Sequence, residues 1–181
     1  MADSNITKKA LADSMKILME NEDFSKISVA DICNQCGMNR KSFYYHFKDK
    51  YDLVNWIFDM EFLSILAPGS QIEPWELLDK VCLYFYDNQK FYRNALRIKG
   101  QNSFEEHFIE LLQPIIKSSI GNILGEEENV EFYMEFCLDA LIGALRRWIT
   151  EKDCMEPEEF LRKMKNCIHI MAVRDKEFFE K

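Results

Sequence analysis

Glycine and proline are scarce in this chain, whose 181 residues include six glycines and four prolines. Because these two residues interrupt regular structure, their scarcity beside many Leu, Lys, Glu and Met residues predicts an all-α fold. No apolar run reaches the ~18 residues of a membrane-spanning helix. The N-terminus also lacks the basic-then-apolar order of a signal peptide. We therefore expect a cytoplasmic protein with no membrane contact.

Histidine is also scarce, and the motifs of common enzyme sites are missing. The three histidines, His46, His107 and His169, stand outside any His/Glu metal motif. The chain contains no GxSxG, P-loop or GxGxxG sequence. We therefore expect no enzymatic activity, no cofactor and no bound metal.

Two of the six cysteines, Cys33 and Cys36, form a single CxxC sequence. Cytoplasmic cysteines are usually free thiols rather than disulfides. A structural zinc site needs four ligands, and one CxxC without a second pair falls short of that number. The pattern favours packing in a helical core. A thiol redox sensor that uses Cys33 or Cys36 is the alternative.

Negative charge dominates the chain, with a formal net charge of −8, but it is unevenly placed. Residues 1–50 carry eight Lys or Arg against seven Asp or Glu, whereas residues 51–181 carry fifteen against twenty-four. The first part therefore suits a polyanionic partner, and the acidic remainder would repel DNA and so orient the molecule on it.

The first fifty residues carry the spacing of a helix-turn-helix. Apolar residues recur at helical intervals over 4–21, and Ser28 with Asp31 resembles a capping box that begins a helix over 29–35. Gly37 suits the end of that helix, and Asn39 suits the start of another over 40–46. In this arrangement the second helix enters the DNA major groove. The expected core of the unit is Leu11, Leu18, Phe24, Ile27, Ile32, Cys33, Met38, Phe43 and Phe47.

The basic and aromatic residues at 37–53 are the candidate DNA contacts. Arg40 or Lys41 could bind guanine O6 and N7 at the start of the second helix. An ordinary solvated face is the alternative for these cations, and the helix-turn-helix spacing argues against it. The expected DNA-binding residues are Ser28, Asn39, Arg40, Lys41, Ser42, Tyr44, Tyr45, His46 and Lys50.

Helical patterns continue through residues 51–181. They predict helices from residue 51 to about 66 and over about 74–89, 104–123 (with a kink or restart at Pro114), 130–150 and 158–174. The last two could pack inward or form a four-helix bundle with a second copy. The expected dimer interface is Leu141, Ala144, Leu145, Trp148, Phe160, Met164, Cys167 and Met171. A pocket for a small-molecule effector is expected at Tyr92, Arg97, His107, Phe108 and Tyr133.

The sequence ISVADICNQCGMNRKSFYYHFKDKYDLVNWIF, residues 27–58, resembles the tetracycline-repressor-like (TetR) family of transcription regulators. It has that family's order of capped helix, glycine, short helix ending in Tyr-x-His-Phe, and Lys-x-x-Leu. WIFDMEF (56–62) and YFYDNQKFYRNALRIKGQNSFEEHF (84–108) are similar to the branch that contains dihydroxyacetone-kinase operon regulators.

The resemblance implies a helix-turn-helix DNA-binding domain at 1–50 and a helical sensing and dimerisation domain at 51–181. It implies a homodimer on a double-stranded palindromic operator that answers to a small molecule or a metabolic sensor protein. It also assigns Tyr44, Tyr45, His46 and Lys50 largely to the DNA backbone. One departure is that Val29 and Ala30 stand where the family often has a polar or basic residue. A co-regulator that depends on a docked sensor protein is the alternative.

Overall fold

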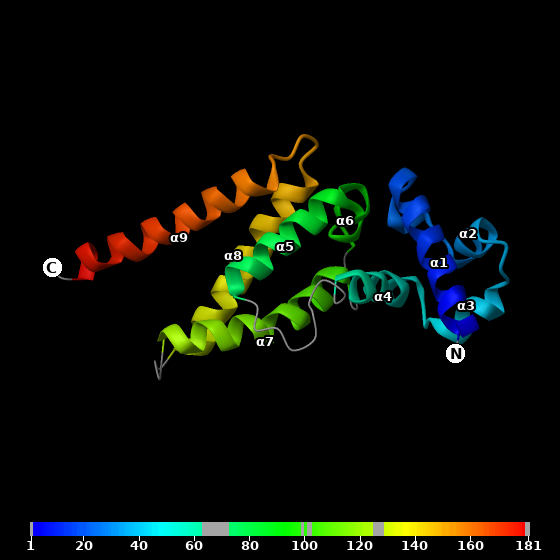
Figure 1. The fold of residues 1–181 in the computed structure, drawn as a ribbon, viewed down its shortest axis with the longest axis horizontal. Helices are drawn as coiled ribbons and strands as arrows, with labels where there is room; N and C mark the ends of the chain where they lie inside the picture. The colour runs from blue at the N-terminus through cyan, green and yellow to red at the C-terminus, as the bar shows by residue number, and fades with distance from the viewer. Residues whose placement is uncertain (1, 63–72, 99, 101–102, 125–128, 180–181) are drawn as a thin grey trace.

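The computed structural model describes residues 2–62, 73–98, 100, 103–124 and 129–179, and the regular elements among these residues are all helices, with no strand (Figure 1). The all-α prediction is therefore confirmed. The elements are α1 (Ala2–Asn21), a 3-10 turn η1 (Phe24–Lys26), α2 (Val29–Gln35), α3 (Arg40–His46), α4 (Lys50–Phe62), α5 (Pro74–Asp87), α6 (Gln89–Ala95), α7 (Phe104–Leu124), α8 (Val130–Thr150) and α9 (Pro157–Phe179).

Helices α1 to α3, which we call the head, pack together near the N-terminus (Figure 1). α2 and α3 span the predicted residues and are joined by the predicted four-residue turn. The predicted core residues Leu11, Phe24, Ile27, Ile32, Cys33, Phe43 and Phe47 are buried. Leu18 and Met38 pack against them and are partly buried. These residues belong to one apolar core that continues through α4 into the rest of the protein.

Helices α5 to α9 form the body, and α4 leads into it from the head (Figure 1). Rings from four helices fill the interior between them. Phe58 of α4 lies 5.3 Å from Phe104 of α7, and Phe85 of α5 stacks 4.4 Å from Tyr92 of α6 (centroid distances). Each of these side chains is almost fully buried. Aromatic packing therefore joins α4 to the body.

The predicted helix over about 74–89 corresponds to α5, and the separate short helix α6 that follows it was not predicted. The break is at Asn88, whose side-chain Nδ2 and backbone N–H both donate to the Tyr84 carbonyl, at 3.0 and 3.2 Å. Asn88 has φ −111° and ψ 30°, outside the helical region. Neither glycine nor proline marks this break, so the apolar pattern continues through it.

The other boundaries stand close to their predicted positions. α7 is one helix that continues through Pro114, without the predicted restart. Gly100, which lies between the predicted helices 74–89 and 104–123, has φ +103°, a conformation that glycine adopts readily. The predicted end of α4 near residue 66 and most of the segment between the predicted helices 104–123 and 130–150 lie outside the described residues. None of the helices in the described part of the chain is both long and apolar enough to cross a membrane.

Candidate nucleic-acid interface

The start of α2 is fixed by a complete capping box. The Asp31 N–H donates to Ser28 Oγ at 3.2 Å, and the Ser28 N–H donates to Asp31 Oδ2 at 2.8 Å. Ser28 Oγ also donates to Asp31 Oδ2 at 2.6 Å. These bonds from Ser28 hold the pKa of Asp31 below its usual value. The one hydroxyl hydrogen of Ser28 is therefore engaged beside a carboxylate, which disfavours the predicted phosphate contact.

The turn between α2 and α3 is closed by backbone bonds and by a second cap. Gly37 has φ +69°, a left-handed conformation, and the Met38 N–H donates to the Cys33 carbonyl at 2.9 Å. Asn39 Oδ1 then accepts the Ser42 N–H at 2.9 Å and the Ser42 hydroxyl at 3.2 Å. Asn39 Oδ1, the Ser42 N–H and the Ser42 hydroxyl are therefore engaged in capping the start of α3.

α3 is anchored by one face and presents the other to solvent. Phe43 is fully buried, and its ring lies 5.8 Å from that of Phe47, which is 3% exposed. Successive residues of a helix are rotated by about 100°. Measured from Phe43, residues 40, 44, 41 and 45 therefore lie at about 60°, 100°, 160° and 200°, one continuous arc beside and opposite the buried ring. Arg40 and Lys41 are exposed, as are Tyr44 (52%) and Tyr45 (82%).

The outer face of α3 has the chemistry of a major-groove surface. The Arg40 guanidinium lies 5.9 Å from the centre of the Tyr44 ring, one helical turn away. The imidazole of half-buried His46 lies 4.9 Å from the Tyr45 ring. Guanidinium and ammonium groups suit guanine edges or phosphates, and phenol hydroxyls suit phosphates. The structure thus brings the predicted Arg40, Lys41, Tyr44 and Tyr45 together on one surface.

Lys50 differs from the prediction. Its ammonium donates to the carbonyls of Phe24 and Ile27 at 2.7 and 2.6 Å and lies 4.2 Å from the centre of the Phe24 ring. Burial lowers its pKa. These contacts tie the start of α4 to the turn that precedes α2. A phosphate contact would have to displace two carbonyl partners, so Lys50 acts in this structure as a positioning residue of the head.

Two further cations at the edge of the head were not among the predicted contacts. Lys48 is exposed directly after α3. Lys8 of α1 places its ammonium 5.7 Å from the Phe47 ring centre and 5.5 Å from that of Trp56, near the end of α3. The sequence signal for Lys8 is weak, because it lies about forty residues before the end of α3 and approaches it through the fold.

Cys33 and Cys36 belong to the packing of the head. Cys33 is buried, and burial, followed by the neighbouring Cys36, raises its pKa. The thiol of Cys36 bonds the carbonyls of Ile32 and Cys33 at 3.3 and 3.5 Å. Among the described residues, no group of three or more His, Cys, Asp or Glu is arranged to hold a metal ion.

Comparisons with known proteins place this geometry in a family. Residues 73–170, more than half of the chain, match the TetR-type "Transcriptional regulator C-terminal region", and residues 16–57 match "Bacterial regulatory proteins, tetR family". The chain belongs to the TetR family of transcriptional regulators. The helix-turn-helix of this TetR-family protein is its DNA-binding element, as the sequence predicts.

Two curated relatives are similar over part of their length. The HTH-type dhaKLM operon transcriptional activator DhaS of Lactococcus lactis subsp. lactis (strain IL1403) is 33% identical over 111 residues, which cover 60% of this chain and 58% of that protein. The transposon Tn10 TetC protein of Escherichia coli is 21% identical over 133 residues, 67% of this chain and 68% of that protein. The match to DhaS thus spans little more than half of its length.

Solved structures share the whole fold. A dihydroxyacetone kinase operon activator DhaS has a TM-score of 0.66 at 23% identity, over 92% of this chain and 96% of that one. A TetR transcriptional regulator from Streptococcus agalactiae 2603V has a TM-score of 0.67 at 22% identity, over 90% and 93%. At such identities these structures establish the TetR fold and no further property.

The residues predicted to line an effector pocket do not come together. Tyr92 and Phe108 belong to the buried aromatic interior, and Tyr92 Oη donates to Tyr84 Oη at 2.8 Å. His107 Nε2 is paired with Asp59 Oδ1 at 2.7 Å. Tyr133 and Arg97 are exposed, on α8 and directly after α6. The aromatic residues that suggested a pocket thus belong mainly to the core, where rings from four helices pack.

Part of the predicted dimer interface is core of this chain. Leu145, Trp148 and Phe160 are buried, and the rings of Trp148 and Phe160 stack at 4.5 Å. The partly buried residues are Leu141, Ala144 and Met164, Cys167 is exposed, and the side chain of Met171 lies outside the description. The apolar stripe of α8 therefore faces its own body at Leu145 and Trp148, because α5, α6 and α7 contact this helix.

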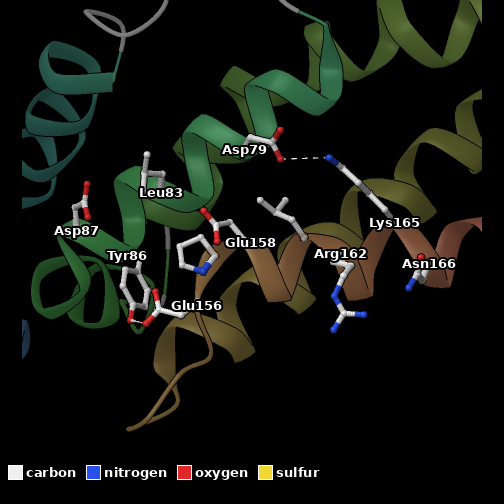
Figure 2. Close-up of a pocket in the computed structure, with 11 residues that line it drawn as sticks. Asp79, Leu83, Tyr86, Asp87, Glu156, Glu158, Arg162, Lys165 and Asn166 are labelled. Carbon is white, nitrogen blue, oxygen red and sulfur yellow. Dashed lines mark hydrogen bonds and ion pairs between the residues drawn. The ribbon is translucent and has the colours of Figure 1, made fainter.

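A groove of about 720 Å³ runs between α5 and the first turns of α9, as Figure 2 shows. Leu83 and Leu161 supply apolar surface within it, and Lys165 Nζ lies 3.4 Å from Asp79 Oδ1 across it. Tyr86 Oη donates to Glu156 Oε1 at 2.6 Å near its end. The groove has mixed charge, and the predicted effector residues are not among those that line it.

Proposed function

We propose that this TetR-family regulator acts as a homodimer whose two α3 helices contact the half-sites of a palindromic operator. The outward face of α3, with Arg40, Lys41, Tyr44 and Tyr45 held by buried Phe43, carries the proposal. We assign base contacts to Arg40 and Lys41 and phosphate contacts to the two tyrosines and the nearby lysines. The boundary between DNA-binding and sensing parts is placed at residue 50, and the site of action is the cytoplasm.

The test begins with selection of bound duplexes from a random pool, followed by affinity measurements on the selected duplex. Arg40→Ala and Lys41→Ala should each reduce discrimination between matched and mismatched base pairs by about 1–3 kcal/mol. Tyr45→Phe, which keeps the ring, is the control for altered packing and should leave base preference unchanged. If the Arg40 and Lys41 variants lose the same affinity for all duplexes, both residues contact the DNA backbone and not the bases. Failure of the wild type to enrich any duplex would overturn the proposal.

We further propose that the operon under control is a metabolic one and that the protein activates it. The relative DhaS supports this, since its name is that of an operon transcriptional activator. A small molecule or a sensor protein would supply the signal by binding the DNA-competent and DNA-free states with different affinity. Transcription from the selected operator, measured with and without the purified regulator, tests the sign. A decrease in transcription when the regulator is added would show that the protein is a repressor.

The need for a partner protein can be tested separately. Purified chain alone should shift the selected duplex in a gel at low salt, because the cations of α3 are already exposed. An absence of binding under these conditions, with binding restored by a cell extract, would favour a co-regulator that depends on a docked sensor.

A further inference from the structure

A slot of about 280 Å³ lies between α1 and α4, apart from the outer face of α3 and from the groove between α5 and α9. The apolar residues that line it are Ala12, Trp56, Ile57 and Met60. Ala12 and Ile57 are buried, whereas Trp56 is half-buried and Met60 is 55% exposed. The volume is close to the lower end of the ~300–1,000 Å³ of small-molecule sites. The slot therefore suits a ligand with a single ring.

The Trp56 ring is held in place by residues that do not line the slot. The Phe47 ring lies 5.5 Å away in an edge contact, and the Lys8 ammonium lies 5.5 Å from the centre of the Trp56 ring. A side chain that is already positioned loses little conformational entropy when a ligand binds. Trp56 can therefore offer an aromatic ligand a prepared surface for an offset or edge contact.

Two opposite charges, Lys9 and Asp13, line the same slot and are exposed. They stand four residues apart on α1, a spacing at which opposite charges often pair. Within the described part of the chain, however, neither side chain forms an ion pair or a hydrogen bond. Their order along the helix, lysine before acid, is also the less favourable one for a pair. An ammonium and a carboxylate are thus available on one edge of an apolar slot.

A second carboxylate in the slot, that of Glu61, is already engaged. Lys16 Nζ lies 2.9 Å from both of its oxygens, and Tyr84 Oη donates to Oε2 at 2.5 Å. Asp13 therefore supplies the available carboxylate of the slot. The exposed amide of Asn5, one turn before Lys9, adds a donor on the side of the ammonium.

We propose that this slot binds a single-ring aromatic zwitterion of the α-amino-acid type. The ring packs against Trp56 and Met60, the ligand carboxylate binds Lys9, and the ligand ammonium binds Asp13. Such a headgroup matches the two charges because its own opposite charges are close together, as Lys9 and Asp13 are across one helical turn. All of these contacts lie within one chain, so the proposal does not depend on the operator-binding homodimer.

The test uses calorimetry of the purified full chain with three probes that share one ring. L-Phenylalanine carries both charges, 3-phenylpropionate lacks the ammonium, and 2-phenylethylamine lacks the carboxylate. Wild type should bind L-phenylalanine with a dissociation constant of about 1 mM or below. Each of the other two probes should bind about fivefold more weakly, the upper range for the loss of one exposed ion pair.

Two exposed substitutions assign the charges. Lys9→Ala should weaken L-phenylalanine about fivefold and leave 2-phenylethylamine no weaker, because that probe has no carboxylate to lose a partner. Asp13→Ala should weaken L-phenylalanine to the same degree and leave 3-phenylpropionate no weaker. Lys26→Ala is the matched control, since Lys26 is an exposed lysine of η1 outside the slot, and it should bind all probes as wild type does.

Tryptophan fluorescence locates the ring of the ligand. L-Phenylalanine should change the emission of wild type, because it packs against Trp56. Trp56→Phe keeps an aromatic wall and should lose that change, although Trp75 on α5 and Trp148 on α8 still emit.

Several results would overturn the proposal. One is the absence of L-phenylalanine binding up to about 10 mM. Another is binding that Lys9→Ala and Asp13→Ala both leave unchanged, or a fluorescence change that Trp56→Phe retains, since either would place the ligand elsewhere. Equal affinity of wild type for all three probes would remove the recognition of a zwitterion. These measurements use no DNA, so they are separate from a failure to select an operator.

Discussion

Lys50 and Lys48 show that neighbouring cations of one motif can serve different purposes. The ammonium of Lys50 is bound by two carbonyls of the η1 turn, whereas Lys48 is exposed beside α3. The sequence places both in the same basic stretch and offers no means of separating them. The distinction depends on η1, some twenty-five residues earlier, which the fold brings against the start of α4.

Replacing these lysines should therefore produce different phenotypes. Lys50→Ala should lower the free energy of unfolding by about 1–3 kcal/mol, because two carbonyls lose a charged donor. Lys48→Ala should leave stability unchanged and reduce the slope of log affinity against log salt by about 0.9, the share of one phosphate. Thermal melts and salt titrations of both variants check this. If Lys50→Ala instead lowers the slope of log affinity against log salt and leaves stability unchanged, Lys50 contacts a DNA phosphate, as the family resemblance implies.

His107 of α7 and Asp59 of α4 form an ion pair whose strength depends on pH. The hydrogen bond to Asp59 raises the pKa of His107 above 6.5, opposed by burial and helped by the charges of Asp59, Glu110 and Asp52. The folded protein therefore holds this proton more tightly than the unfolded chain. The contribution to stability is fully present below pH 6.5 and is lost as the pH rises through the raised pKa.

Thermal unfolding at about pH 5.5 and about pH 8.5 measures this contribution. His107→Gln should unfold with a smaller difference between the two conditions than wild type, and Asp59→Asn should show a similarly reduced difference. His169→Gln, at an exposed position on α9, is the control and should keep the wild-type difference. The same difference in His107→Gln as in wild type would assign the pH dependence to other groups.

Cys33 lacks the properties of a reactive thiol, since it is buried and its pKa is raised. Brief peroxide treatment should therefore leave DNA affinity unchanged in wild type. The double variant Cys33→Ala/Cys36→Ala should show the same insensitivity. Cys137 and Cys167 are exposed, so a second double variant at those positions controls for oxidation elsewhere. A loss of affinity in wild type that only the Cys33/Cys36 variant prevents would establish a redox sensor.

At the scale of elements, the head was predictable because its helices begin and end on local chemistry. Ser28 and Asn39 cap α2 and α3, and Gly37 takes the left-handed conformation that ends α2. The break between α5 and α6 was not predicted, since neither glycine nor proline marks it and the apolar pattern runs through Asn88. The interface on α8 was mispredicted in part, because an apolar stripe is the same pattern whether it faces its own chain or a partner.

At the scale of the whole molecule, the head lies at one end and α9 runs toward the other (Figure 1). The formal net charge of residues 51–181 is −9, since fifteen cations stand against twenty-four acids. The described body also exposes the apolar side chains Phe132 and Phe136 on α8 and Ile170 on α9. We expect these exposed apolar side chains to contact a second copy in the proposed homodimer.

Phe136→Glu should therefore weaken self-association by about tenfold or more, because a carboxylate would be buried in the interface. Leu83→Glu provides the matched control, since Leu83 is 55% exposed and Phe136 is 61% exposed, but Leu83 lies on α5. Sedimentation over a range of concentrations measures both variants. Dissociation of the Leu83 variant, with an intact dimer for the Phe136 variant, would move the interface to the α5 side.

The packed rings of Phe58, Phe85, Tyr92, Phe104 and Phe108 have an evolutionary consequence. Truncating one of them, as in Phe108→Ala, would cost about 3–5 kcal/mol and leave an apolar void. Voids of this kind stay dry and accept aromatic guests of matching size. A single substitution that removes one ring could therefore create a new ligand-binding cavity in the body. A ligand that binds there would restore the stability that the truncation removed.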